Sequence, residues 1–206
     1  LIFLEYISSD NGTLSLAEAL LDKEASKILP TSDLITDFPL EIGHNTLLFT
    51  DVVGSTDLYF ELGDTKAFSK IRQSFLHIGS ICSKHQAVLV KTIGDAAMYA
   101  FQSPKQAIMA AIELQKENPK ENLRLRVSLH SGNCLSISTA DGLDFFGDTV
   151  NICAKFQAAA EANEIVFDES FFDEDLKELT KDIFCEPLSF ELKGSSKRSF
   201  NLLRLR

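Results

Sequence analysis

The chain has 206 residues, 45% of them hydrophobic, and a formal net charge of −10. This length and apolar content can supply a buried core, and they favour one domain with an appendage. Binding to nucleic acid needs a basic surface, so the acidic balance predicts no nucleic-acid partner. No apolar run approaches the roughly 18 residues of a membrane-spanning helix, so we expect no membrane contact by this fragment.

The four cysteines, Cys82, Cys134, Cys153 and Cys185, include no C-x-x-C pair. Their spacing argues against a zinc site or a redox motif and favours a reducing, cytoplasmic location. Residue 1 is Leu and not Met, so we interpret the chain as a fragment. The full-length protein could therefore carry an upstream membrane anchor or sensor.

Residues 1–45 have a less regular pattern of apolar and polar residues than the rest of the chain. A strand candidate over Leu1–Ile7 precedes apolar residues with mixed helical spacing between Leu14 and Leu21, and Pro30 and Pro39 then interrupt regular structure. We interpret this segment as the tail of an upstream domain followed by a linker. Residues 46–206 form the second predicted domain.

Regular patterns begin at Thr46. Strands are expected at Thr46–Val53, Val88–Ile93, Ala96–Phe101, Arg124–His130, Leu135–Ser138, Ile165–Phe167, 183–191 and 198–205. Helices are expected at Thr65–Gln86, where Phe68, Ile71, Phe75, Ile78 and Ile81 have helical spacing, at Pro104–Gln115, from Gly147 to Ala162, and at Asp173–Thr180. We expect 135–138 to be the hairpin partner of 124–130. The mixture predicts an α+β domain with helices packed on a mixed sheet.

Several common catalytic motifs are absent: the chain has no phosphate-binding P-loop, no H-E-x-x-H, no G-x-S-x-G and no EF-hand loop. Asp51 instead ends an apolar strand, beside the turn Gly54-Ser55-Thr56 and the expected start of a helix. Its carboxylate is a hard ligand for magnesium or manganese, and free N–H groups at a helix start favour an anion. The alternative is that Asp51 only caps that helix.

Three other polar residues have equally ordinary explanations when each is taken alone. Asp95 follows Gly94 in a predicted hairpin turn, where aspartate needs no function. Lys91 would be an exposed strand lysine and Asp144 a loop acid.

Taken together, three segments carry a resemblance. Phe49–Thr56, Lys91–Ala96 and Asp144–Lys155 resemble, in the same order, three signature blocks of class III adenylate and guanylate cyclases. The resemblance covers about residues 45–205, and the linker with Leu29-Pro30 and Leu40–Gly43 looks like that of a bacterial multidomain subgroup. It implies a ferredoxin-like βαββαβ core with a mixed, mainly antiparallel sheet covered by helices.

The resemblance also implies an activity and its cofactors. The positions that match Asp51 and Asp95 hold two divalent metal ions, Mg or Mn, in the family, with the carbonyl of Val52 as a further ligand. These ions serve the conversion of ATP to cyclic AMP and pyrophosphate by attack of the ribose 3′-hydroxyl. We therefore expect an adenylate cyclase that acts in intracellular signalling.

Lys91 and Asp144 match the positions that distinguish adenine from guanine in the family, and Lys with Asp is the adenine-type pair. Guanine usually meets Glu and Cys or Ser there. A lysine can donate to adenine N1 and an aspartate can accept from the N6 amine, whereas guanine reverses both demands.

Further substrate contacts follow from the same comparison. Asn151 matches the residue that orients the ribose, and Lys155 stands where the family normally has a transition-state arginine. Lysine keeps the charge and loses the planar fork, so we expect a slow enzyme. The alternative is an ordinary solvated helix lysine. Substrate contacts are also expected from Gly54, Ser55 and Thr56, and from Lys193, with Lys197 as the weaker candidate. We interpret His130 as structural.

The resemblance implies a homodimer, because the metal aspartates and the base-reading residues of one site come from opposite subunits. An upstream regulatory domain of the same chain could control how the subunits meet. Two competing hypotheses stay open. One is a catalytically weak or inactive module for nucleotide binding or dimerisation, favoured by Lys155, and the other is a guanylate cyclase.

Overall fold

The computed structural model describes residues 40–117, 123–139, 142–171, 173–192 and 198–205. Its elements are, in chain order, β1 (Leu40–Val53), α3 (Ser55–Leu62), α4 (Asp64–Lys84), β2 (Val88–Ile93), β3 (Ala96–Phe101), α5 (Pro104–Glu117), β4 (Arg124–Thr139), β5 (Gly142–Phe146), α6 (Asp148–Phe156), the 3-10 turn η3 (Gln157–Ala159), β6 (Ile165–Asp168), the 3-10 turn η4 (Glu169–Phe171), α7 (Glu174–Thr180), β7 (Cys185–Leu192) and β8 (Arg198–Leu205). The expected strands and helices from Thr46 onward are largely present.

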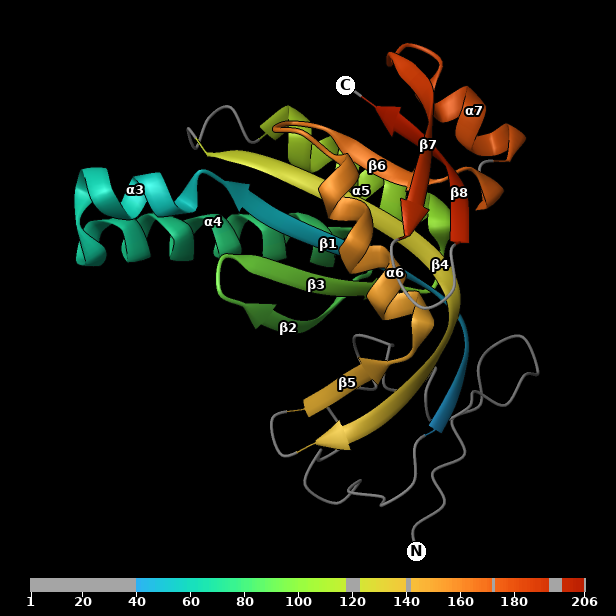
Figure 1. Ribbon diagram of the computed structural model, residues 1–206. Coiled ribbons are helices and arrows are strands. Elements are labelled where there is room, and N and C mark those ends of the chain that lie inside the picture. The colour runs from blue at the N-terminus through green and yellow to red at the C-terminus, as the bar shows by residue number, and fades with distance from the viewer. Residues whose placement is uncertain (1–39, 118–122, 140–141, 172, 193–197, 206) are drawn as a thin grey trace, which may run out of the picture.

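One sheet organises these elements (Figure 1). Its strand order is β2-β3-β1-β4-β6-β8-β7, and β5 pairs with β4 beside this path. The β4–β6 pair is parallel and every other pair is antiparallel. The structure thus confirms an α+β fold with a mixed, mainly antiparallel sheet covered by helices.

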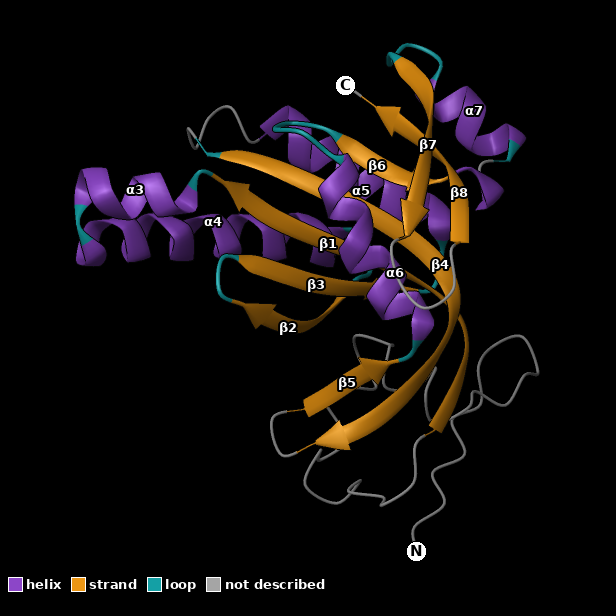
Figure 2. Ribbon diagram, in the orientation of Figure 1, coloured by secondary structure: helices purple, strands orange, loops and turns teal. Residues whose placement is uncertain are grey.

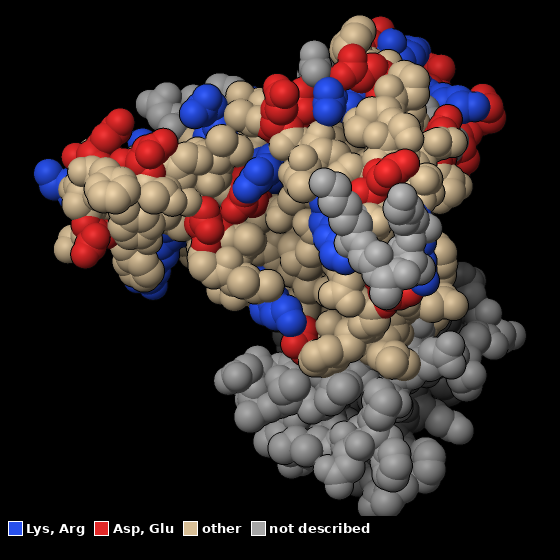
Figure 3. Space-filling model, viewed as in Figure 1, with Lys and Arg blue, Asp and Glu red and all other residues tan. Residues whose placement is uncertain are grey.

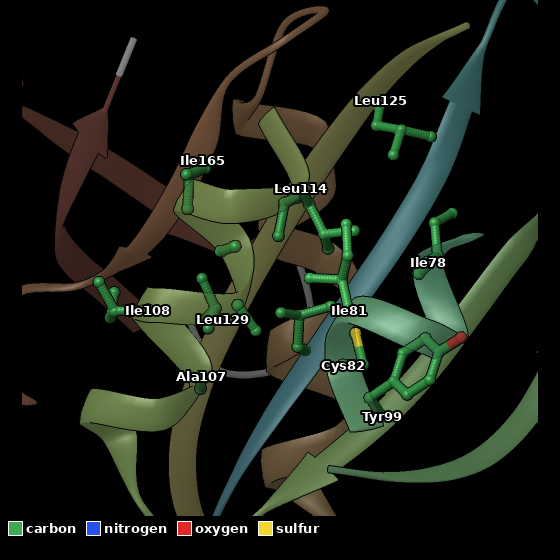
Figure 4. Packing of buried hydrophobic residues seen from close by; sticks show 14 of the residues in the cluster. Ile78, Ile81, Cys82, Tyr99, Ala107, Ile108, Leu114, Leu125, Leu129 and Ile165 are labelled. Carbon is green, nitrogen blue, oxygen red and sulfur yellow. The ribbon is translucent and has the colours of Figure 1, made fainter. Parts of the chain in front are cut away.

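The main core lies between one face of the sheet and the helices α4 and α5. Alternate side chains of a strand point to opposite faces, and Leu48 and Val52 of β1 meet Leu125 and Leu129 of β4 on this face. Helices α4 and α5 cover them with Ile78, Ile81, Cys82, Ala107, Ile108 and Leu114 (Figure 4). This dry layer fixes the sheet that carries the candidate site.

The opposite face of the sheet is covered by α6 and is shown in Figure 2. Leu47 and Phe49 of β1 pack here with Cys153 of α6. A third cluster places Ile152 and Phe156 of α6 against the β7–β8 hairpin. Helix α6 is therefore wedged between the sheet centre and that hairpin.

The prediction for residues 135–138 was wrong. They do not fold back on Arg124–His130 but continue the same strand, and their hairpin partner is β5. Strand β4 stays paired with β1 through Ser131, Gly132 and Asn133, so no turn interrupts it. The predicted hairpin implied a turn between residues 130 and 135, but pairing with the long strand β1, which begins at Leu40, outweighs that local preference.

Other differences concern helix faces and ends. Phe68 was expected to be buried but is 60% exposed, whereas Ile71, Ile78 and Ile81 enter the core. Helix α6 ends at Phe156 and gives way to η3, short of the predicted end at Ala162. The elements predicted within residues 1–39 lie outside the described residues.

Two surface properties follow. No helix among the described residues is long and apolar enough to cross a membrane. On the face shown in Figure 3, acidic and basic side chains are intermingled, and its described residues form no continuous basic patch.

Candidate active site

Asp51 lies near the end of β1 on the face that carries Leu47 and Phe49. Its neighbours across the ladders are Ala96 of β3 and Arg126 of β4. Arg126 Nε donates to Asp51 Oδ2 at 2.5 Å, and Arg126 Nη2 forms an ion pair with the same oxygen. Helix α3 has Gly54 as its N-cap and no side-chain cap, so Asp51 is not a capping residue.

Asp95 approaches Asp51 from the β2–β3 turn. Gly94 has φ 63° there, a left-handed conformation that glycine adopts without strain. Burial raises the pKa of Asp51, and the negative charge and carboxyl contact of Asp95 add to this rise, while Arg126 opposes it. The two aspartates predicted as metal ligands are thus brought together.

The donors at this point fit a pair of hard divalent ions. Carboxylate oxygens are the ligands that Mg²⁺ and Mn²⁺ prefer, and such ions commonly complete their shells with water and phosphate oxygens. No cluster of three or more His, Cys, Asp or Glu side chains occurs in the described part of the chain, which argues against a closed protein cage. Val52, whose carbonyl is the third predicted ligand, is buried beside Asp51.

Lys91 and Asp144 form a second polar pair, between β2 and β5. Lys91 Nζ donates to Asp144 Oδ1 and Oδ2, both at 2.7 Å. The Phe145 N–H also donates to Asp144 Oδ1 at 2.8 Å, which orients the carboxylate. The two residues therefore form an ion pair between neighbouring strands, and Asp144 lies in β5 and not in a loop.

Phe146 and Arg126 are two neighbours that the sequence did not single out. Lys91 Nζ lies 5.6 Å from the Phe146 ring centroid, a cation–π distance. Arg126 is in the alternating strand that includes His130, but only the ladder register places it opposite Asp51. The motif Asp144–Lys155 contained Phe146, so its position was available as a signal.

The turn Gly54-Ser55-Thr56 opens helix α3 directly after β1. Gly54 has φ 78°, so a side chain there would be strained. The first N–H groups of a helix lack intrahelical partners and carry partial positive charge. These groups lie within a few residues of Asp51, an arrangement suited to an anion beside a metal ion.

Helix α6 presents Asn151 and Lys155, both exposed. Its other side is pinned to the sheet: Cys153 Sγ contacts the Leu47 carbonyl at 3.3 Å, and Ser128 Oγ donates to the Cys153 carbonyl at 2.8 Å. At its first turn, Thr149 Oγ1 donates to the Asn133 carbonyl at 2.7 Å. Asn151 and Lys155 are four residues apart and so share a helix face.

Some predicted residues are not brought into this arrangement. Lys193 and Lys197 lie outside the described residues. His130 is buried, 3.3 Å from Asp168 through Nδ1 and Oδ2, with Phe156 and Phe200 packed edge-on against its ring. This environment agrees with the structural role expected for His130.

Comparison with known proteins identifies the family of this chain. Residues 40–198 match the family described as adenylate and guanylate cyclase catalytic domain. Guanylate cyclase 32E of Drosophila melanogaster is 26% identical over 62% of this chain, and receptor-type adenylate cyclase A of Leishmania donovani is 26% identical over 61%. The chain spans only 13% and 12% of those relatives' lengths.

Solved structures show the same fold. The adenylyl cyclase CyaB from P. aeruginosa has a TM-score of 0.67 and 22% identity, over 82% of this chain and 96% of that one. The guanylate cyclase domain of RhGC from Catenaria anguillulae, solved with GTP, has a TM-score of 0.66 and 20% identity, over 81% and 98%. This chain belongs to the adenylate and guanylate cyclase catalytic domain family.

Proposed function

We propose that this chain is the catalytic domain of an adenylate cyclase, which converts ATP to 3′,5′-cyclic AMP and pyrophosphate. The observation that carries this proposal is the contact of Lys91 with Asp144 at the base-reading positions. An ammonium donor and a carboxylate acceptor side by side match adenine N1 and its N6 amine, which are also adjacent. Guanine would oppose both groups, at a cost of about 1–3 kcal/mol for each mispaired polar group.

Asp51 and Asp95 are the proposed ligands for two divalent ions, Mg or Mn, with the Val52 carbonyl as a further ligand. Such ions, when bound, make the ribose 3′-hydroxyl a better nucleophile and offset the charge that builds on the leaving pyrophosphate. The sheet's contribution is to hold Asp51 in a fixed position beside the β2–β3 turn that carries Asp95.

The other residues position the nucleotide. Oxygen O3′ attacks the α-phosphorus of the same molecule, the bond from that phosphorus to pyrophosphate breaks, and the hydroxyl proton passes to solvent water. The acceptor of the phosphoryl group is part of the substrate itself, so orientation supplies much of the rate. We assign the ribose to Asn151, the transition-state charge to Lys155, and the triphosphate to the turn Gly54-Ser55-Thr56 and to Lys193.

Lys155 favours a second candidate function, a catalytically weak or inactive module for nucleotide binding or dimerisation. Its ammonium lacks the fork with which arginine grips two phosphate oxygens. Loss of one preorganised donor can slow an enzyme by roughly 10²–10³. The contact between Asp51 and Asp95 supports the enzyme, because an inactive module has no need of paired carboxylates.

A guanylate cyclase is the third candidate, since the relatives include cyclases of both kinds. Guanine bound at this site would place a hydrogen-bond donor against Lys91 and an acceptor against Asp144. The ion pair of these two side chains therefore supports ATP as the substrate.

We further propose a homodimer with sites shared between subunits. The strands that carry or adjoin the Lys91–Asp144 pair also bear exposed apolar side chains: Leu89 and Ile93 on β2, Phe146 on β5, and Leu135 on β4 opposite Phe146. Clustered apolar surface of this kind is typical of protein interfaces. Asp51 lies on a different strand pair from Lys91, which itself pairs with Met98. Solved relatives include domains described as dimeric and others described as monomeric.

The segment before β1 is proposed to couple an upstream regulatory domain to this dimer. Deleting residues 1–39 leaves every described element intact and tests this directly. Changed activity or dimerisation supports the coupling, and unchanged behaviour in both contradicts it.

The direct test of the proposed function is a product assay on the purified chain. We expect cyclic AMP from ATP with Mn²⁺ or Mg²⁺, and none from an Asp51→Ala control. We also expect Lys155→Arg to be about 10²-fold faster, because it restores the planar fork. Binding of ATP without product, in the chain and in Lys155→Arg alike, would establish the inactive module instead.

A further inference from the structure

Arg126 contacts a proposed metal ligand, and the geometry of this contact is specific. Its Nε and Nη2 both meet Asp51 Oδ2, so one edge of the guanidinium converges on a single carboxylate oxygen. Charge-assisted hydrogen bonds of this kind are about twice as strong as neutral ones. Asp51 Oδ2 is therefore already held by a cation of the protein itself.

The sheet makes this contact a consequence of the fold. Asp51 and Arg126 lie directly opposite each other in the β1–β4 ladder, on the same face. The aspartate side chain is 12% exposed and the arginine side chain 39% exposed. The carboxylate is thus fixed among the strands, whereas the longer guanidinium reaches it from the open side and can return to water.

A divalent ion at Asp51 and Asp95 requires the same negative charge. Asp51 lies opposite Ala96, the neighbour of Asp95, so two carboxylates share this point, and the guanidinium of Arg126 contacts one of them. Arg126 therefore supplies part of the positive charge that an ion would supply, at the same carboxylate. Two cations in contact with one partly buried oxygen repel each other.

We propose that Arg126 is an internal competitor of the metal: its guanidinium must leave Asp51 Oδ2 before that carboxylate can bind a divalent ion fully. This inference rests on the proposed function only in taking Asp51 and Asp95 as the metal ligands. It makes Arg126 a positioning residue, which sets how much metal the site needs.

The test measures Mn²⁺ binding to the purified chain from the loss of the free-ion signal in electron paramagnetic resonance, with no nucleotide present. We expect Arg126→Gln to bind Mn²⁺ about tenfold more tightly than the unaltered chain, the effect of removing roughly one charge-assisted competitor. Arg126→Lys keeps the charge with a single donor group and should fall between the two. Asp51→Asn gives the baseline for binding elsewhere.

Arg124→Gln is the matched control for overall charge. It removes one arginine from the same strand, where the Arg124 side chain lies against Gly54 instead of Asp51. A general field effect is screened by salt, so we expect less than about a twofold change. Circular dichroism checks that each variant is folded. If Arg126→Gln does not fold, the comparison of Arg126→Lys with the unaltered chain still tests the proposal.

Unchanged or weaker Mn²⁺ binding by Arg126→Gln overturns the proposal, and weaker binding would make Arg126 an orienting residue of Asp51. An equal gain in Arg124→Gln also contradicts it. The outcome is independent of turnover. If the chain forms no cyclic product but Arg126→Gln tightens Mn²⁺ binding, the proposed function fails and the competition stands. If the chain forms cyclic AMP but Arg126→Gln does not tighten Mn²⁺ binding, the proposed function stands and the competition fails.

Discussion

Among single residues, Lys91 and Asp144 are the two that we propose to determine which base the site accepts. Both ionic contacts between them are 2.7 Å long, and the Phe145 N–H holds the carboxylate from the other side. A base edge that approaches this pair meets a donor and an acceptor in a fixed order. The order, more than the charge of either residue, distinguishes adenine from guanine.

Reversing that order should reverse the preference. We expect the double variant Lys91→Glu, Asp144→Cys to lower kcat/KM for ATP by about tenfold or more and to raise it for GTP, since each mispaired polar group costs about 1–3 kcal/mol. Both nucleotides are assayed separately by chromatography of the cyclic products. Lys105→Gln, on the exposed side of α5, lowers the net charge by one, as the double variant does, and is the control for charge. An unchanged ATP preference in the double variant would remove Lys91 and Asp144 from base recognition.

The candidate residues that lie within short motifs could be named from the sequence, whereas a neighbour that depends on strand register could not. Asp51, Asp95, Lys91 and Asp144 were proposed from their motifs, and the structure places them in two pairs. Arg126 is 75 residues from Asp51, and only the β1–β4 pairing makes them neighbours. Local patterns contain no information on that pairing.

At the scale of elements, helix α6 depends on a close approach to strand β4 at Gly132. A Cβ at Gly132 would lie 2.6 Å from Thr149 Oγ1. Thr149 also donates to the Asn133 carbonyl, so it has little freedom to move away. Helix α6 carries Asn151 and Lys155, and any shift of its first turn would move both.

We therefore expect Gly132→Ala to destabilise the protein by about 1–3 kcal/mol, the usual cost of overpacking, and to lower cyclase activity beyond the loss of folded protein. Gly79→Ala is the matched control, since a Cβ there would meet Tyr99 Oη at an ordinary 3.6 Å. In the middle of α4 it should stabilise by about 0.4–1 kcal/mol. Urea unfolding measures both, and equal stabilities for the two variants would contradict this account of Gly132.

The β6 end is held by Asp168, whose ionisation gives a pH dependence. Burial alone would raise the pKa of Asp168, but the nearby His130 ring and the hydrogen bond from the Ser170 N–H outweigh burial and lower it. Because this pKa lies below the ordinary value of 3.8 in the folded protein, the charged form stabilises the fold above that value. The contribution is lost as pH falls below 3.8 through the lowered pKa.

Asp168→Asn should therefore unfold at lower urea, with a loss of about 1–2 kcal/mol at pH 7 and the same loss at pH 5. As the pH falls from 3.8 through the lowered pKa, the gap should shrink, because the unaltered protein then loses its carboxylate. A gap that stays constant over this fall in pH would show that shape, and not charge, explains the effect. Asp175→Asn, at an exposed site, is the control.

Strand and helix positions were predictable where the local residue pattern is strong. They were less predictable where packing or pairing with a segment distant in the sequence determines the structure. The pattern of Ile71, Ile78 and Ile81 located α4 and its buried face, but Phe68 had the right spacing and is exposed, because the end of α4 that carries it extends with α3 away from the sheet (Figure 1). The turn predicted between residues 130 and 135 was likewise overridden by pairing with β1.

For the whole molecule, the proposed homodimer needs two chains for each site. In that proposal Asp51 comes from one subunit of a shared site, and Asn151 from the other. Asp51→Ala and Asn151→Ala chains should each be inactive alone. Mixed in equal amounts and allowed to exchange subunits, they should recover about a quarter of normal activity, since half of the dimers then contain one intact site of two.

The recovered activity is measured as cyclic AMP formed after mixing, at the same total protein concentration as the unaltered chain. Mixing two samples of Asp51→Ala is the control and should recover nothing. If the mixed variants stay inactive although sedimentation shows that they exchange subunits, each site must be complete within one chain.

The proposed preference of this cyclase domain for ATP over GTP can be measured in one competition experiment. The purified chain is supplied with ATP and GTP at equal concentration with Mn²⁺, and the two cyclic products are counted by mass spectrometry. Their initial ratio equals the ratio of kcat/KM for the two nucleotides. We predict cyclic AMP in at least about tenfold excess over cyclic GMP. Cyclic GMP in equal or greater amount would contradict it.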